Sequence, residues 1–205
     1  AMSQNPVELR TATANHEWSL QFPRVVAYQI FTRSFADGNG DGKGDLIGIR
    51  KKLPYLKELG IGALWLTPIF KSPSYHKYDV TDYYAIDPEY GNMADLKALV
   101  NEAHASNIKI ILDFVANHTS VKHPWFQEAA KFNNNPYQDF YIWSRDKEEW
   151  ARDPEHWYYP DPKNPGDEKY YAFFSPGMPD LNYDNDTVRS RMIHAAEYWI
   201  QQTGI

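Results

Sequence analysis

The stretch Lys109-Ile-Ile-Leu-Asp-Phe-Val-Ala-Asn-His118 decides the fold class of this chain, because a run of apolar strand formers ends abruptly at Asn117 and His118. Strands that are apolar on both faces are typical of parallel sheets, which helices cover on both sides. Ligands of such sheets bind beyond the carboxyl ends of the strands. The stretch therefore predicts the edge of an active site, although a loop histidine that only caps local structure is the plainer interpretation of His118.

Two earlier runs, residues 25–31 and 63–69, are also apolar and rich in strand formers. Together with residues 109–115 they predict three strands, and right-handed crossovers between them would make the sheet parallel. Asp113 lies inside the third strand, where an ionised carboxylate is costly unless it is paired. We therefore expect Asp113 either to have a cationic partner or to lie near the open end of its strand.

Helical periodicity fills the gaps between these strands. An apolar repeat over residues 46–59 ends at Gly60, and Pro54 should kink or restart that helix. Asn92 is the expected cap of a second helix, and residues 187–202 carry the apolar stripe of a third. Helices that alternate with strands in this way predict an α/β fold.

The alternation is interrupted after residue 118. Residues 119–184 are rich in Asn, Pro, Asp and aromatic residues, which predicts a packed insertion rather than another strand-helix unit. The predicted organisation is an N-terminal extension (1–22), strand-helix units (23–118), the insertion (119–184) and a final helix (185–205).

The composition of the 205 residues limits the class of function. A net charge of -6 and a pI near 5.6 supply no basic surface for nucleic acid. No apolar run reaches the length of a membrane span. Without cysteine, disulfides and thiolate metal sites are excluded. The seven Trp and fifteen Tyr suit both sugar binding and ordinary packing, so they do not choose between these roles.

The stretch Asp37-Gly-Asn-Gly-Asp-Gly-Lys-Gly-Asp45 carries oxygen-bearing side chains at alternate positions, and its glycines allow tight turns. Oxygen ligands at this spacing suit a hard cation. The stretch resembles the start of an EF-hand loop, but Gly48 stands at the twelfth position, where that loop needs a bidentate Glu. A structural metal is therefore favoured over a calcium sensor and over a metal-free turn, in which the acids would repel one another.

A third motif, Ser74-Tyr-His-Lys-Tyr-Asp-Val-Thr-Asp-Tyr-Tyr84, follows the second predicted strand. Its position is therefore the same carboxyl edge that His118 occupies. This position of Tyr78 suits stacking on a sugar ring, although aromatic residues in loops more often serve packing.

Four segments resemble, in the same order, the motifs of the alpha-amylase family of glycoside hydrolases, family thirteen. They are residues 37–45, 78–83, 113–118 and Met178-Pro-Asp-Leu-Asn182. The resemblance covers nearly everything from about residue 23 to residue 205. It implies an α/β fold that is the amino-terminal portion of a (β/α)8 TIM barrel, with the irregular insertion after strand three as domain B.

The resemblance implies roles in substrate binding. Tyr78 resembles the tyrosine that stacks under the glucose at the cleavage site, His118 resembles the histidine that bonds the same sugar, and Asp113 resembles an aspartate that supports the site. Relatives that trim single glucoses typically carry Asp where this chain has Tyr75. Residues 178–182 are similar to those of amylases between the oligo-1,6-glucosidase and neopullulanase groups. Endo-type cleavage of α-1,4-glucans is therefore expected.

The resemblance also implies metal ligands. The family's first-loop site for Ca2+, or Mg2+ as the alternative ion, is matched by four side chains and one backbone carbonyl: Asp37, Asn39, Asp41, Asp45 and the Lys43 carbonyl. Asn117 resembles the ligand of a second calcium near domain B.

By the same resemblance, the nucleophile, the acid/base residue and a third carboxylate follow strands four, five and seven, beyond Ile205. The chain alone is therefore expected to be inactive, with the carboxyl-terminal part of the barrel as its partner. Joined to that part, it is expected to be a retaining hydrolase of α-glucans such as starch. The alternatives are an exo-acting α-glucosidase, a trehalose-synthase-like transglycosylase and, in another class, a non-catalytic glucan- or metal-binding fragment. The substrate class favours a secreted or periplasmic location over the cytoplasm.

Overall fold

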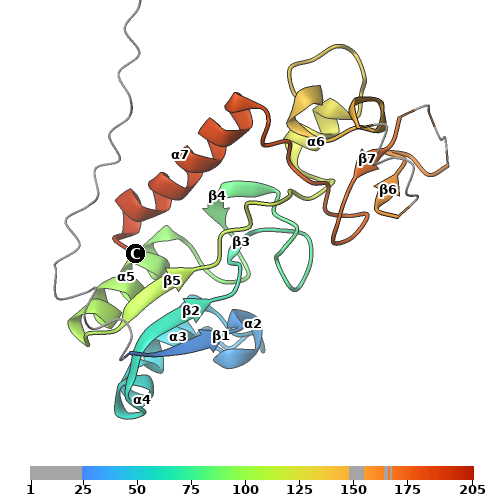
Figure 1. Cartoon of the computed structure of the whole chain (residues 1–205). Helices are drawn as coiled ribbons and strands as arrows, with labels where there is room; N and C mark the ends of the chain where they lie inside the picture. Colours follow the sequence, from blue (N-terminus) through green and yellow to red (C-terminus); the bar gives the residue numbers. More distant parts are fainter. Residues whose placement is uncertain (1–24, 148–154, 164–165, 167) are drawn as a thin grey trace, which may run out of the picture.

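The computed structural model of this chain describes residues 25–147, 155–163, 166 and 168–205, so the predicted extension over residues 1–22 lies outside the described residues. At the centre is a parallel sheet with the strand order β1-β2-β5 (Figure 1). Its strands are β1 (Val26–Ile30), β2 (Ile61–Leu66) and β5 (Lys109–Leu112). The predicted parallel sheet is confirmed.

The third strand is shorter than predicted, since β5 ends at Leu112 instead of residue 115. The backbone N–H of Asp113 still donates to the carbonyl of Leu66 at 3.0 Å. Asp113 therefore lies directly past the strand, half-buried at its open end, and this was the second of the two expectations for its carboxylate.

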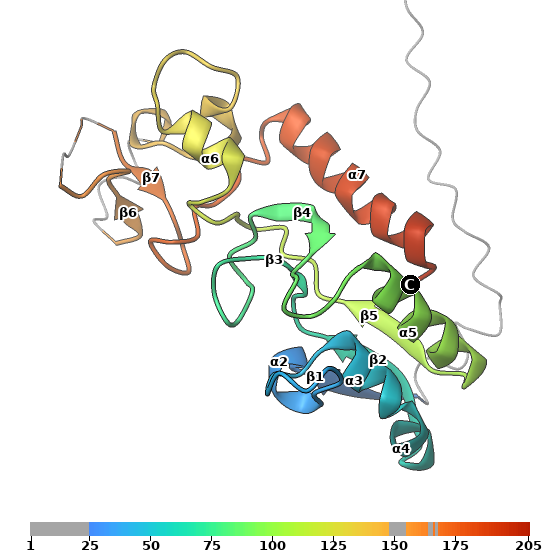
Figure 2. The same ribbon diagram turned by 180° about the vertical axis from the view of Figure 1, so that it is seen from behind.

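Helices α3 (Leu46–Lys51), α4 (Leu53–Glu58) and α5 (Met93–Ala105) lie on one side of the sheet, in front of it in Figure 2. The predicted restart at Pro54 is confirmed, because Pro54 occupies the first turn of α4, where its missing N–H costs no hydrogen bond. Gly60 ends this region in the left-handed conformation, at φ +83°.

The predicted cap of the next helix is also confirmed. The Asn92 side chain accepts from the backbone N–H of Asp95, and the Asp95 side chain accepts from the N–H of Asn92 in return. Helix α7 (Asp186–Thr203) begins after a similar cap at Asn185, and it contacts α5.

The other face of the sheet is exposed in the described part of the chain. This face carries three residues that are neighbours across the strands, namely Gln29, Trp65 and Ile111. Trp65 is 41% exposed and Ile111 is 39% exposed. The expectation that helices cover both faces is therefore wrong. A sheet that curves into a barrel needs helices only on its outer face, because its inner face packs against side chains of other strands.

A hairpin that the sequence did not predict follows β2. Strands β3 (Phe70–Lys71) and β4 (Asp82–Ile86) pair antiparallel, and α7 packs beside β4. The loop between the two strands contains Tyr78 and projects past the carboxyl ends of the parallel strands (Figures 1 and 2).

The described residues of the stretch 119–184 form a lobe of short elements at one end of the molecule (Figure 1). They are α6 (Pro124–Ala129), two 3-10 turns (Gln138–Phe140 and Ser144–Asp146), β6 (Trp157–Tyr158) and β7 (Tyr170–Tyr171). Phe126 stacks on Trp143 with ring centroids 6.1 Å apart and contacts Tyr141 and Tyr170 edge-on. These four rings are buried, so aromatic packing replaces regular structure in the lobe. Within the described ranges, no helix is long and apolar enough to cross a membrane.

Candidate substrate-binding site

Tyr78 and Asp113 meet beyond the carboxyl ends of β2 and β5. The Tyr78 hydroxyl donates to Oδ2 of Asp113 at 3.1 Å. Burial, and then the Asp113 carboxylate, raise the pKa of Tyr78, so the hydroxyl remains a donor near neutral pH. Tyr78 is 36% exposed. Its ring therefore has a fixed orientation and free surface, which suits the flat apolar face of a sugar.

His118 lies behind Tyr78 and is only 4% exposed. Its Nε2 is 3.0 Å from the Tyr78 carbonyl oxygen, and its Nδ1 is 3.3 Å from the side-chain nitrogen of Asn117. Since a carbonyl only accepts, Nε2 carries the proton and Nδ1 is the acceptor. Burial lowers the pKa of His118, which favours this neutral form. The structure thus brings the three predicted substrate-binding residues together, with His118 holding the Tyr78 backbone.

The segment 178–182 pairs with the chain at Asn117 and His118 through backbone hydrogen bonds. Asp180 forms an antiparallel bridge with His118, and the N–H of Leu181 donates to the Asn117 carbonyl at 2.9 Å. Oδ1 of Asp180 accepts from the backbone N–H of Phe173 at 3.0 Å, while burial raises the pKa of this carboxyl. Two of the motifs found in the sequence therefore form one structural unit. Asn117 remains exposed beside it, with its carbonyl already engaged.

The predicted metal loop folds tightly on itself. The Asp37 carboxylate accepts backbone N–H bonds from Gly40 and Gly42 at 2.6 and 2.8 Å, and these bonds lower its pKa. Asp45 is buried and accepts from the N–H of Gly48 at 2.6 Å, which caps α3. In the described part of the chain, no three His, Asp or Glu side chains converge as a cation site.

The donor chemistry of this loop still fits a hard cation. The side chains of Asp37, Asn39 and Asp41 are exposed, and each of their oxygens has lone pairs beyond those that the loop uses. Gly44 allows the loop to pack closely against the backbone at Thr32, because a Cβ at position 44 would lie 1.9 Å from the carbonyl oxygen of Thr32. The loop therefore has a defined position next to α2 (Thr32–Phe35) and offers carboxylate and amide oxygens to an ion.

A family model described as "Alpha amylase, catalytic domain" matches residues 29–205. The chain belongs to the alpha-amylase family. Its three parallel strands and their helices are accordingly part of the (β/α)8 barrel that defines this family's catalytic domain, as the sequence predicted.

Among its alpha-amylase family relatives, "Alpha-amylase 3" of Dictyoglomus thermophilum is 50% identical over 188 residues, which are 92% of this chain and 36% of that protein. An oligo-1,6-glucosidase of Parageobacillus thermoglucosidasius is 43% identical over 87% of this chain and 33% of its own length. The structure is similar to that of the isomaltulose synthase SmuA from Protaminobacter rubrum, with a TM-score of 0.79 and 37% identity over 89% of this chain and 34% of the synthase. The chain thus spans about a third of the length of the relatives it matches.

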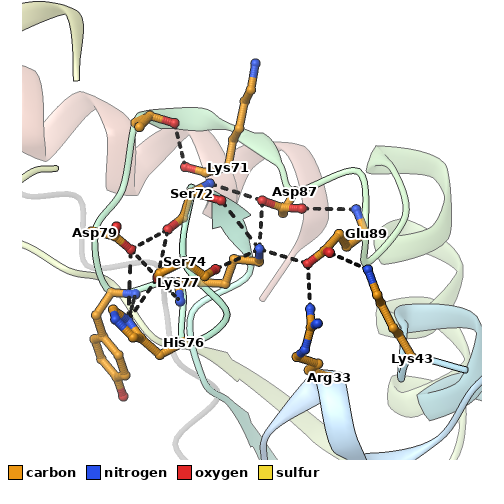
Figure 3. A network of polar contacts seen from close by, with 12 residues as sticks. Arg33, Lys43, Lys71, Ser72, Ser74, His76, Lys77, Asp79, Asp87 and Glu89 are labelled. Carbon is orange, nitrogen blue, oxygen red and sulfur yellow. Dashed lines mark hydrogen bonds and ion pairs between the residues drawn. The ribbon is translucent and has the colours of Figure 1, made fainter. Parts of the chain in front are cut away.

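One group of charged residues near the site was not found from the alpha-amylase family motifs. Lys77, next to Tyr78, is buried and pairs with Asp87 at 3.1 Å and with Glu89 at 3.0 Å. Glu89 also pairs with Arg33 and Lys43, so segments that are distant in the sequence meet in this network (Figure 3). The only sequence signal for this network is the charged residue Lys77 directly before the aromatic residue Tyr78.

Proposed function

We propose that the protein containing this chain is a retaining glycoside hydrolase of the alpha-amylase type, which cleaves α-1,4-glucosidic bonds of starch, maltodextrins or related α-glucans. The observation that carries this proposal is the group of Tyr78, Asp113 and His118 at the carboxyl edge of a parallel sheet. Family membership supports it. Because the chain spans about a third of its relatives, the activity is proposed for the whole protein.

In this proposal, Tyr78 stacks under the glucose whose bond is cleaved, and Asp113 fixes the angle of the ring through the hydroxyl. His118 holds the backbone of Tyr78 through its Nε2 proton. The same N–H donates to a hydroxyl of the sugar if the ring turns away from the Tyr78 carbonyl when substrate binds. The three residues orient the sugar and exclude water from one of its faces.

The carboxylates that break the bond are proposed to lie beyond Ile205, so that the 205-residue chain alone is inactive. Retaining hydrolysis needs two carboxyl groups about 5 Å apart on either side of the bond. Asp79, next to Tyr78 in the sequence, and Asp180, which forms a bridge with His118, already have structural roles. Asp79 accepts from the Ser72 hydroxyl at 2.6 Å, and Asp180 accepts from the Phe173 N–H.

A structural divalent cation, Ca2+ or Mg2+, is part of the proposal. Its ligands would be the side chains of the 37–45 loop and the Lys43 carbonyl, namely Asp37, Asn39, Asp41, Lys43 and Asp45. An ion held there would neutralise the acids of this loop. Asn117, an exposed residue, is proposed as a ligand of a second ion near domain B.

Exo-acting cleavage or transglycosylation is the second candidate, because relatives include an oligo-1,6-glucosidase and an isomaltulose synthase. Tyr75 favours the endo-acting alternative. It is 65% exposed and packs edge-on against Phe31, at a position where exo-acting relatives typically carry Asp. An aromatic side chain there offers a further sugar-stacking surface and no carboxylate to close the end of the cleft.

The deciding experiment incubates the full-length protein separately with maltoheptaose, isomaltose and sucrose and follows the products by chromatography. Proton NMR of the first products reports the anomeric configuration. The proposal expects maltooligosaccharides of several lengths, released with retained configuration, and no turnover by the 205-residue chain alone. Release of glucose alone, or turnover of isomaltose without turnover of maltoheptaose, would establish the second candidate. The absence of any turnover would leave the non-catalytic binding function.

A further inference from the structure

Lys77 is the one buried lysine or arginine among the residues that the structure describes. Its side chain is 3% exposed, and its ammonium group is surrounded by acceptors. Nζ lies 3.1 Å from Oδ2 of Asp87, 3.0 Å from Oε2 of Glu89 and 3.0 Å from the Ser74 carbonyl oxygen. A buried charge is stable only when it is paired in this way, so the position of Lys77 is tightly determined.

The backbone of Lys77 is also unusual. Its φ is +64°, in the left-handed region that residues with a Cβ rarely adopt. The N–H of Lys77 donates to the Ser74 hydroxyl at 3.1 Å. The left-handed turn directs the lysine side chain inward, towards Asp87 and Glu89 (Figure 3), while the next residue, Tyr78, reaches Asp113. The turn and the buried charge therefore determine together the backbone position of Tyr78, from which its ring extends.

Glu89 connects this turn to α2 and to the 37–45 loop, which follow β1. Its carboxylate accepts from Lys43 at 2.7 Å, from Arg33 at 2.9 Å and from Lys77 at 3.0 Å. Hydrogen bonds from Lys43 and Lys77 lower the pKa of Glu89 to about 2, so it is charged in the whole range in which proteins are usually active. Asp87 adds bonds from the backbone N–H groups of Ser72 and of Glu89 itself.

We propose that Lys77 is a positioning residue for Tyr78, because its buried ammonium group, held by Asp87 and Glu89, fixes the turn that presents the tyrosine ring to Asp113 and to a bound glucose. This role rests on the proposed function as far as the glucose is concerned. The fixed orientation of the ring is a property of the folded protein and can be measured without substrate.

The test uses the full-length protein with the substitution Lys77→Met, which keeps an unbranched side chain only one atom shorter and removes its charge. Glu89→Gln is the second variant, because Glu89 is partly exposed and the change keeps its shape. Lys131→Met is the matched control, since Lys131 follows α6 and forms an exposed ion pair with Glu128. For NMR, a separate preparation of the wild type and of each of these three variants carries 3-fluorotyrosine at position 78, and its 19F resonance reports the order of that ring.

The kinetic arm measures kcat/KM for maltoheptaose in a double-mutant cycle with Tyr78→Ala. If Lys77 acts through Tyr78, Lys77→Met lowers kcat/KM about 10-fold when Tyr78 is present and less than about twofold in the Tyr78→Ala background. The 19F resonance should broaden or shift in Lys77→Met and, to a smaller extent, in Glu89→Gln. Lys131→Met should change neither measurement.

Equal fold-losses of kcat/KM in both backgrounds would overturn the positioning role and leave Lys77 with a general structural one. An unchanged 19F resonance in a folded Lys77→Met variant would overturn it as well. If Lys77→Met does not fold, an unchanged resonance in Glu89→Gln has the same meaning. A wild-type protein that does not hydrolyse maltoheptaose would contradict the proposed function, while the 19F comparison would still decide whether Lys77 orders the ring.

Discussion

The hydroxyl of Tyr78 donates a hydrogen bond to Oδ2 of Asp113 at 3.1 Å, which joins the loop after β3 to the residue directly past β5. This bond predicts different outcomes for two substitutions at one position. Tyr78→Phe loses the bond and keeps the ring, so kcat/KM for maltoheptaose should fall by only about 3-fold to 10-fold. Tyr78→Ala also loses the stacking surface and should lower it about 10-fold to 100-fold. Equal losses would show that the ring itself contributes nothing.

Substitution of His118 should lower kcat strongly, by more than the loss of a buried side chain alone would cause. His118→Ala removes the donor to the Tyr78 carbonyl and, in the proposed function, a sugar contact, so kcat should fall about 100-fold. The circular-dichroism spectrum should remain that of a folded protein. His194, an exposed histidine on α7, provides the control, and His194→Ala should leave kcat unchanged. A near-normal kcat in His118→Ala would contradict the role of His118.

The features that were correctly predicted from sequence depend on short stretches of chain. The caps at Asn92 and Gly60 are local, because a side chain or a backbone conformation within a few residues determines them. The parallel order of the strands followed from their alternation with helices. Tyr78 and His118 were placed at one edge because the carboxyl ends of parallel strands share it.

The features that were missed depend on long-range contacts. The pairing of Lys77 with Glu89 needs the β3-β4 hairpin, whose strands are only two and five residues long and give almost no periodic signal. The exposed face at Trp65 was missed because an apolar strand has the same pattern whether helices or other strands cover it. Whether Trp65 is exposed depends on which elements pack against its strand, and the sequence of the strand does not show this.

The 37–45 loop predicts a cation-dependent stability. Removing the ion with EDTA should lower the Tm of the full-length protein by several degrees, and Ca2+ or Mg2+ should restore it, because a ligand that binds only the folded state stabilises it by about 3 kcal/mol at a hundred times its Kd. Asp41→Ala should reduce the response to EDTA to the part that comes from the proposed second ion at Asn117. Glu58→Ala, which removes an exposed acid of α4, should retain it. Elemental analysis that finds no bound cation would refute the structural metal.

His123 predicts a pH dependence of stability that is separate from the substrate site. It is buried against the rings of Tyr83 and Trp125, and its Nδ1 accepts from the backbone N–H of Trp125 at 3.1 Å, as the cap of α6. Burial lowers its pKa to about 4 from the ordinary value of 6.5. Between these two values the unfolded chain binds a proton that the folded protein does not, so this residue makes the free energy of unfolding rise with pH.

The contribution of His123 is therefore fully present above pH 6.5 and is lost as the pH falls towards 4, with a maximum of about 3 kcal/mol. His123→Asn keeps an oxygen that can accept from Trp125 and removes the titrating ring. Urea unfolding at pH values from about 7 down to about 4 should show a shallower decline in the variant than in the wild type. Burial also lowers the pKa of His118, so only the difference between the two proteins reports on His123. Parallel declines would show that His123 does not contribute to the pH dependence of stability, so that burial does not lower its pKa.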